Sequence, residues 1–153
     1  MNYLKISVLC TALCLCLYAP AQNNRIAPLS ESGYSKPKLF NDLPERMQLQ
    51  VTNLEQLIDE PVGSTIKTHI GDHFIFEGTV VSKANDHDVK SVVIRSSNWQ
   101  GATLTFTKAH YADGSFSYIG RIISLENSDA YEIVQQNGKY ILQKRDLNDL
   151  ISE

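Results

Sequence analysis

The segment YEIVQQNGKYILQK, residues 131–144, decides the fold, because it places two runs of β-forming residues around an Asn-Gly pair. Asn137-Gly138 suits a two-residue type I′ turn, in which both central residues have positive φ. This turn sets a register in which Ile133 lies opposite Leu142. One face of the hairpin then carries an apolar stripe, made of Tyr131, Ile133, Tyr140 and Leu142. The segment therefore predicts a half-buried antiparallel hairpin.

The stretch TFTKAHYADGSFSYIGRII, just before it in the chain, predicts a second hairpin that turns at Asp113-Gly114. A two-residue turn at this position would pair Tyr111 with Phe116. The same register would place Phe106 on the opposite face from Tyr111. We therefore expect either a β-bulge between these two residues or a sheet that is exposed unevenly on both sides.

Runs of β-branched and aromatic residues, separated by turn residues, continue throughout the chain from residue 64. They predict strands at residues 64–70, 73–83, 89–96, 102–109, 115–124, 130–136 and 139–144. No long helical segment lies between these runs, which argues against parallel crossovers. The predicted fold is mainly β, an antiparallel sandwich or partly closed barrel of about seven to eight strands with one short N-terminal helix.

The preceding segment, ERMQLQVTNLEQLIDEPVGS, fits two patterns. Its apolar residues alternate like a strand from Met47 to Val51, but they also fit helical spacing from Met47 to Ile58. We favour a strand followed by a helix at residues 54–59, with Asn53 as its N-cap.

Two further features bear on packing. Gly78 and Gly120, inside predicted strands, indicate bends or close approach of neighbouring strands. The closing segment RDLNDLISE predicts one helical turn from Asp146. Its apolar residues, expected to cover the end of the sheet, are Leu147, Leu150 and Ile151.

Residues 1–21 predict an export signal, because Lys5 precedes an apolar run and Ala19-Pro20-Ala21 fits the small-x-small rule of signal peptidase. The mature protein would begin near Gln22 and be secreted or periplasmic. The apolar run is shorter than the roughly 20 residues of a membrane-spanning helix. Each cysteine follows a leucine, whereas a lipoprotein signal requires a small residue there. No membrane anchor is predicted.

Residues 22–42 are rich in Ser, Pro and Asn and show no periodicity, so they predict a flexible leader before a single β-rich domain at residues 43–153. Tyr34 and Phe40 offer an alternative, in which they dock on the domain. The three cysteines, all inside the predicted signal, are Cys10, Cys14 and Cys16. The mature chain therefore has neither disulfides nor thiolate chemistry.

Charge and motifs exclude several functions. Lys5 is the one charged residue of the first 21, so the formal net charge of −3 becomes −4 without them, which argues against nucleic-acid binding. His69 and His73 lack a third metal ligand, and the acidic stretch at residues 85–88 is too short for a calcium loop. No G-x-S-x-G motif is present. We predict no catalytic residues, no cofactor and no metal.

The segments FEGTVVSK, SVVIRSSNWQGATLTFTK and YIGRIIS, with the closing hairpin, resemble a group of uncharacterised small secreted proteins of Bacteroidota-type bacteria. The resemblance covers roughly residues 43–153 and implies an exported β domain without catalytic residues. More weakly, the F-x-G-x-V strand and Tyr-rich hairpin resemble the β-rich pro-domain of reprolysin-like metalloproteases. That resemblance implies a detached binding module, because this sequence has no H-E-x-x-H motif.

The features of this sequence that remain able to bind a partner are aromatic side chains and strand edges. The candidate partner contacts are Trp99, Tyr111, Phe116 and Tyr118. For Trp99 the alternative is a lid over one end of the core. The sequence thus favours an exported noncatalytic binding or interaction module, whose partner is a protein or a small apolar ligand. The alternatives are a pro-domain-like inhibitor of a secreted metalloprotease and a barrel that carries a small apolar ligand.

Overall fold

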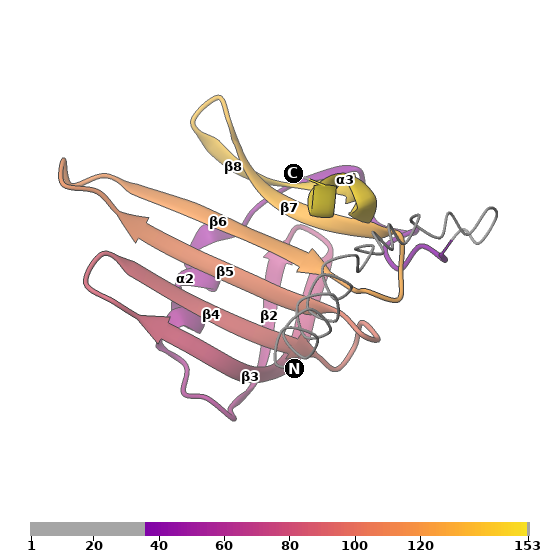
Figure 1. The fold of residues 1–153 in the computed structure, drawn as a ribbon, viewed down its shortest axis with the longest axis horizontal. Coiled ribbons are helices and arrows are strands. Elements are labelled where there is room, and N and C mark those ends of the chain that lie inside the picture. Colours follow the sequence, from indigo (N-terminus) through magenta and orange to yellow (C-terminus); the bar gives the residue numbers. More distant parts are fainter. Residues whose placement is uncertain (1–35, 153) are drawn as a thin grey trace, which may run out of the picture. The chain divides into compact units, whose positions relative to one another are not determined.

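Eight antiparallel strands form one sheet in the computed structural model, which describes residues 36–152 (Figure 1). Their order is β1-β8-β7-β6-β5-β4-β3-β2, so consecutive strands from β2 to β8 are neighbours and need no crossover. The strands are β1 (Arg46–Gln48), β2 (Thr65–Gly71), β3 (Phe74–Asn85), β4 (Val89–Ser96), β5 (Thr103–His110), β6 (Phe116–Ile123), β7 (Asp129–Gln136) and β8 (Lys139–Asp146). The predicted mainly β, antiparallel class is confirmed.

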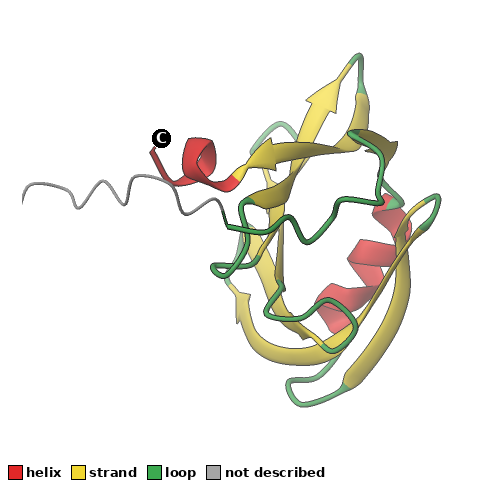
Figure 2. Ribbon diagram, turned by 90° about the vertical axis from the view of Figure 1, so that its right-hand side faces the viewer, coloured by secondary structure: helices red, strands yellow, loops and turns green. Residues whose placement is uncertain are grey.

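The sheet curls into a half-barrel whose two edge strands are linked at one end (Figure 2). The Leu49 N–H donates to the Tyr140 carbonyl on β8 at 3.1 Å. The next residue, Gln50, donates its N–H to the Ile70 carbonyl on β2, also at 3.1 Å. The two residues that follow edge strand β1 thus bond to its neighbour, β8, and to the other edge strand, β2. Of the two architectures predicted, the partly closed barrel is the one that forms.

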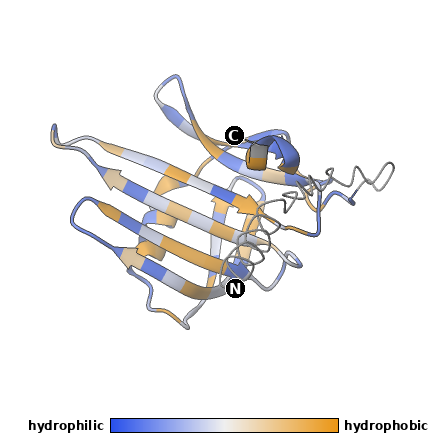
Figure 3. Cartoon of the chain, in the orientation of Figure 1, coloured by the Kyte–Doolittle hydropathy of each residue, from blue (hydrophilic) through white to orange (hydrophobic). Residues whose placement is uncertain are grey.

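The core fills the concave side of the sheet. Hydropathy changes from residue to residue along the strands, as expected when successive side chains lie on opposite faces (Figure 3). On β3, Phe74 and Phe76 are fully buried, while Ile75 between them is partly exposed. The rings of Phe40, Phe74 and Tyr131 contact one another, with centroids 5.2 to 5.8 Å apart. Side chains of the protein itself therefore occupy the interior of the half-barrel.

Two glycines allow neighbouring strands to approach closely. A Cβ on Gly78 would lie 2.3 Å from the carbonyl oxygen of Arg95, and one on Gly120 would lie 2.4 Å from that of Thr105. Only a residue without a side chain fits at either position. The prediction of close packing at these glycines is confirmed.

The helix α2 (Val51–Asp59) packs Leu54 and Leu57 into the core from the concave side of the sheet. It begins at Val51 rather than at residue 54, and Gln50 occupies the N-cap position without a side-chain cap bond. Asn53 instead donates its side-chain amide to the His69 carbonyl on β2 at 2.7 Å. The predicted N-cap is therefore wrong, because a tertiary hydrogen bond uses the side chain of Asn53.

The hairpin of β7 and β8 has the predicted register, with Ile133 opposite Leu142. Asn137 and Gly138 have φ values of 51° and 74°, as a type I′ turn requires. The turn chemistry of two residues was sufficient to define this pairing.

The hairpin of β5 and β6 differs from its prediction by one residue. His110, not Tyr111, lies opposite Phe116, and the two strands pair without a register shift. The Gly114 N–H donates to the Tyr111 carbonyl at 2.9 Å, and Gly114 has a φ of 83°. The Tyr111 N–H also donates to the Ser115 carbonyl, so the loop has three residues, Ala112, Asp113 and Gly114, in a type I turn that ends at a left-handed glycine. The extra residue lies in the turn, so the bulge expected within the strand is absent.

Residues just before the predicted domain boundary belong to the core. Phe40 is fully buried, and its N–H donates to Asp129 Oδ2 at 2.9 Å. The Leu39 N–H donates to the other carboxylate oxygen of Asp129 at 2.6 Å. Of the two alternatives for Phe40, docking is the one observed, and the predicted leader does not extend to residue 42. The predicted export signal, the leader up to residue 35, and Tyr34 lie outside the described residues.

The chain closes with helix α3 (Leu147–Ser152), as the sequence predicts. Its first residue, Leu147, is buried, but Ile151 is 66% exposed, so Ile151 does not cover the sheet as expected. Within residues 36–152, no helix has the length and apolar character needed to cross a bilayer.

Candidate binding groove

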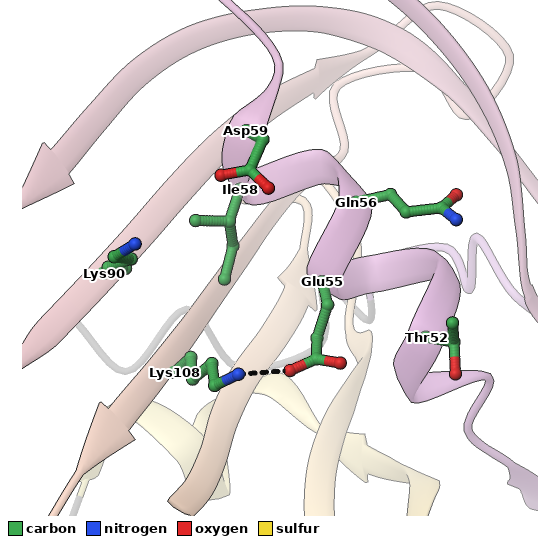
Figure 4. A pocket seen from close by; sticks show the side chains of 7 residues that line it. All are labelled: Thr52, Glu55, Gln56, Ile58, Asp59, Lys90 and Lys108. Atoms are coloured by element: carbon green, nitrogen blue, oxygen red, sulfur yellow. Dashed lines mark hydrogen bonds and ion pairs between the residues drawn. The ribbon is translucent and has the colours of Figure 1, made fainter.

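A groove lies between α2 and the strands β4 and β5 (Figure 4). It consists of two pockets that share Lys90 and Lys108, and we call it the Lys108 groove. The first pocket has a volume of about 320 Å³ and is lined by Thr52, Glu55, Gln56, Ile58, Asp59, Lys90 and Lys108. The second has a volume of about 300 Å³ and is lined by His87, Asp88, Lys90, Lys108, His110 and Phe116.

A hydrogen-bonded cluster joins α2 to the β5–β6 hairpin in the first pocket. Lys108 Nζ donates to Glu55 Oε1 at 2.5 Å, and the Tyr118 hydroxyl donates to the same oxygen at 2.8 Å. The hydrogen bond from Lys108 lowers the pKa of Glu55. Burial, and then the Glu55 carboxylate, raise the pKa of Tyr118 to about 12. At neutral pH Glu55 is therefore charged and Tyr118 is neutral.

An exposed aromatic ring lies among basic side chains in the second pocket. Phe116 is 49% exposed, and Lys108 Nζ lies 4.2 Å from its ring centroid. The His110 ring contacts the Phe116 ring at a centroid distance of 4.9 Å. His110 Nδ1 lies 4.0 Å from Asp88 Oδ1. The half-exposed Phe116 ring, with the Lys108 ammonium over one face, is therefore suited to noncovalent contact with a ligand or partner.

Alternation along β5 explains how the sequence builds this site. Phe106, Lys108 and His110 share the inner face, which changes from apolar to polar toward the hairpin turn. Opposite them on β6, Tyr118 faces Lys108 and Phe116 faces His110. Tyr118 also stacks on Phe106, with centroids 5.8 Å apart and an interplanar angle of 7°. The core therefore holds the inner end of the site in place.

Three of the four predicted contact residues belong to this one hairpin. Tyr111 is 50% exposed, and its hydroxyl lies 3.0 Å from Ser117 Oγ. Phe116 is half exposed in the groove. Tyr118 is partly buried, and its hydroxyl already bonds Glu55. Tyr111 and Phe116 thus keep the most free surface.

The fourth predicted contact, Trp99, lies at the opposite ends of β4 and β5 and is not brought near the others. Its ring is partly buried against Phe40 and Phe74, at centroid distances of 5.5 and 5.3 Å. Its indole N–H donates to the Ile75 carbonyl at 3.0 Å. This geometry is that of a lid over the core, the alternative that the sequence left open for Trp99.

The histidines considered as metal ligands remain apart from this site. His69 lies on β2 and His73 in the turn that follows, and both are exposed. In the part of the chain that the structure describes, no group of three or more His, Cys, Asp or Glu side chains is placed to hold a metal ion.

Glu55, Lys90 and Lys108 were missed at the level of sequence. The sequence did contain a signal for Lys108. It lies two residues after the buried Phe106 on the same strand, so its side chain points to the same inner face, where an ammonium group needs a polar partner. That partner, Glu55, lies 53 residues earlier in the chain, so no local spacing identifies it.

No protein-family model, curated protein or solved structure matches this chain. Both resemblances drawn from the sequence stay predictions.

Proposed function

We propose that this protein is an exported, noncatalytic binding module whose partner is another protein, contacted through the Lys108 groove and the adjoining β5–β6 turn. One observation carries the proposal. Phe116, half exposed, lies between the groove and the turn, beside Lys108 and His110. Exposed aromatic rings on a rigid hairpin provide contact area with little loss of side-chain entropy.

The packing of the interior favours a protein partner over a small apolar ligand. A carrier barrel encloses its ligand, but here Phe40, Phe74 and Tyr131 occupy the concave side of the sheet. The Lys108 groove is instead open and lined mainly by polar side chains. Export in this proposal depends on residues 1–21, which lie outside the described part of the chain.

Site-specific photocrosslinking in the native host tests the proposal. A benzophenone amino acid replaces Phe116 in one variant and Val62, which is 59% exposed and outside the groove, in a matched control. We expect a discrete adduct from position 116 that position 62 does not give. Identical adducts at both positions, or none at 116, would contradict the proposal. A secreted metalloprotease in the adduct would point to the inhibitor hypothesis, which a stoichiometric inhibition assay then checks.

A further inference from the structure

The strand β6 pairs with β7 over only part of its length. Within residues 36–152 the two strands pair at Arg121↔Glu132 and Ile122↔Tyr131, whereas β6 pairs with β5 from end to end. Residues 116–120 therefore have a neighbouring strand on one side only, and β7 diverges from them (Figure 1). We call the other side of residues 116–120 the open β6 edge.

The register of the β5–β6 hairpin identifies the main-chain groups at the open β6 edge. The Tyr111 N–H donates to the Ser115 carbonyl at 2.9 Å, and hydrogen-bonded pairs recur at every second residue from there. Ser117 therefore directs its N–H and C=O groups toward β5. Phe116 and Tyr118 direct theirs away from β5, toward the open β6 edge.

Such an edge is a template for another strand, because its N–H and C=O groups have the spacing of a β ladder. Side chains on both faces favour the addition of a strand. Phe116 on the inner face is 49% exposed, and Ile119 on the outer face is 57% exposed. An added strand would cover both while it satisfied the main chain of β6.

The charge beside the edge selects the kind of strand. Phe116 also lines the second pocket of the Lys108 groove, where two lysines, Lys90 and Lys108, lie with one carboxylate, Asp88. Glu55 and Asp59 line the first pocket, on the far side of Lys108 from the edge. Lys108 is paired with Glu55, but Lys90 has no ion pair or side-chain hydrogen bond among the described residues. Acidic side chains on the inner face of an added strand would complement this charge.

We infer that the open β6 edge binds an extended segment of a protein partner by strand addition, with acidic residues on the side that faces Lys90 and the second pocket of the Lys108 groove. The inference rests on the proposed function, for which it supplies the mode of contact. A second copy of this chain is a poorer occupant, because β6 itself, FSYIGRII, contains no acidic residue and could not supply the complementary charge.

Selection from a displayed library of random peptides on the immobilised full-length chain provides the probe. We expect the selected peptides to alternate apolar and polar residues and to contain an excess of Glu and Asp. On binding, amide hydrogen exchange should slow at Phe116 and Tyr118, which face the open edge. N-methylation of one edge-facing amide of the peptide should weaken binding roughly fivefold, the effect of about one hydrogen bond.

Two pairs of variants separate backbone from side-chain effects. Phe116→Pro and Phe116→Ala both remove the ring, but only proline also removes the N–H at the open edge, and the first residue of a strand tolerates proline. We expect Phe116→Pro to bind roughly fivefold more weakly than Phe116→Ala. Lys90→Glu should weaken binding at low salt, whereas Arg95→Glu, with the same charge change on the outer face of β4, should not.

The remaining outcomes overturn the inference. Selected peptides that bind without slowing exchange at Phe116 and Tyr118 would leave the proposed function standing and remove the strand-addition site. Exchange at Phe116 and Tyr118 that is already slow without peptide would show that the edge is occupied. A dependence on protein concentration would identify a second copy as the occupant. Loss of the protection when residues 1–35 are deleted would identify that segment instead. Failure to select any peptide, together with no photocrosslinked adduct at position 116, would remove both proposals.

Discussion

Gly138 and Gly120 show two different reasons why a single position requires glycine. Gly138 has a φ of 74°, and no atom lies within 4 Å of the Cβ that another residue would add there. Its constraint is therefore the left-handed backbone alone. At Gly120 the backbone has no such φ, but a Cβ would lie 2.4 Å from the Thr105 carbonyl oxygen and 2.9 Å from Ile133 Cδ1. The constraint there is space between strands.

These two constraints predict different losses of stability. Gly138→Ala should lower the free energy of unfolding by about 1 kcal/mol, and Gly138→Asn by less, since asparagine tolerates the left-handed region. Gly120→Ala should cost about 2 to 3 kcal/mol, because strands β5 and β6 must separate to admit the methyl group. Urea unfolding monitored by circular dichroism measures all three. Equal losses for alanine and asparagine at position 138 would contradict the assigned turn type.

The loop between β4 and β5 acts as an element that ties three strands together. Asn98 Oδ1 accepts the Glu77 N–H, and the side-chain amide of Asn98 donates to the Ile75 carbonyl, both at 3.0 Å. Trp99 donates its indole N–H to the same carbonyl and packs on Phe74. The side chains of Asn98 and Trp99 thus bond to β3, at the end of the sheet away from the Lys108 groove.

Trp99 should therefore contribute to stability and not to binding. We expect Trp99→Ala to lower the free energy of unfolding by about 2 to 4 kcal/mol, because it removes a ring from a packed cluster. Trp99→Phe, which loses chiefly the indole hydrogen bond, should cost about 1 kcal/mol. The crosslinked adduct at position 116 should form with both variants. Loss of this adduct in a Trp99→Phe protein that melts normally would restore Trp99 as a partner contact.

At the scale of elements, the sequence defines positions better than register. Alternation and turn residues locate β2 to β8, because burial on one face imposes a period of two on each strand. Asn137-Gly138 also fixes register, since both residues must have positive φ. Asp113-Gly114 resembles that pair but forms a three-residue loop, in which Asp113 Oδ1 accepts the Ser115 N–H at 2.9 Å. Sequence alone does not distinguish these two turns.

Over the whole molecule, contacts between distant segments determine the site, and these are the ones that the sequence does not indicate. Asp129 receives the Phe40 N–H from 89 residues away, and Glu55 receives Lys108 from 53 residues away. Neither pair shows a pattern at helix or strand spacing. The candidate aromatic residues Tyr111 and Phe116 were identifiable by type, but the groove beside them exists only after α2 packs against the curled sheet.

The cluster of Glu55, Lys108 and Tyr118 should make global stability depend on pH at both extremes. The pKa of Glu55 is lowered by Lys108, so its contribution is complete above the ordinary value of 4.5 and is lost as the pH falls through the lower folded-state pKa. The pKa of Tyr118 is raised from 10.0 to about 12, so its contribution is complete below pH 10.0 and is lost as the pH rises toward 12. Burial raises the pKa of Tyr131 as well, which adds to the alkaline loss.

Melting temperatures measured from acid to alkaline pH test this prediction with three variants. Glu55→Gln should melt lower than the parent at neutral pH and lose less of its stability on acidification, because the carboxylate that must be protonated is gone. Tyr118→Phe should flatten part of the alkaline decline and leave the part due to Tyr131. Glu126→Gln, which removes an exposed carboxylate outside the groove, is the matched control at neutral pH, where it should melt at nearly the temperature of the parent. If Glu55→Gln instead followed the parent curve, the ion pair with Lys108 would not connect α2 to the hairpin in solution, and the Lys108 groove would lose the contact that shapes it.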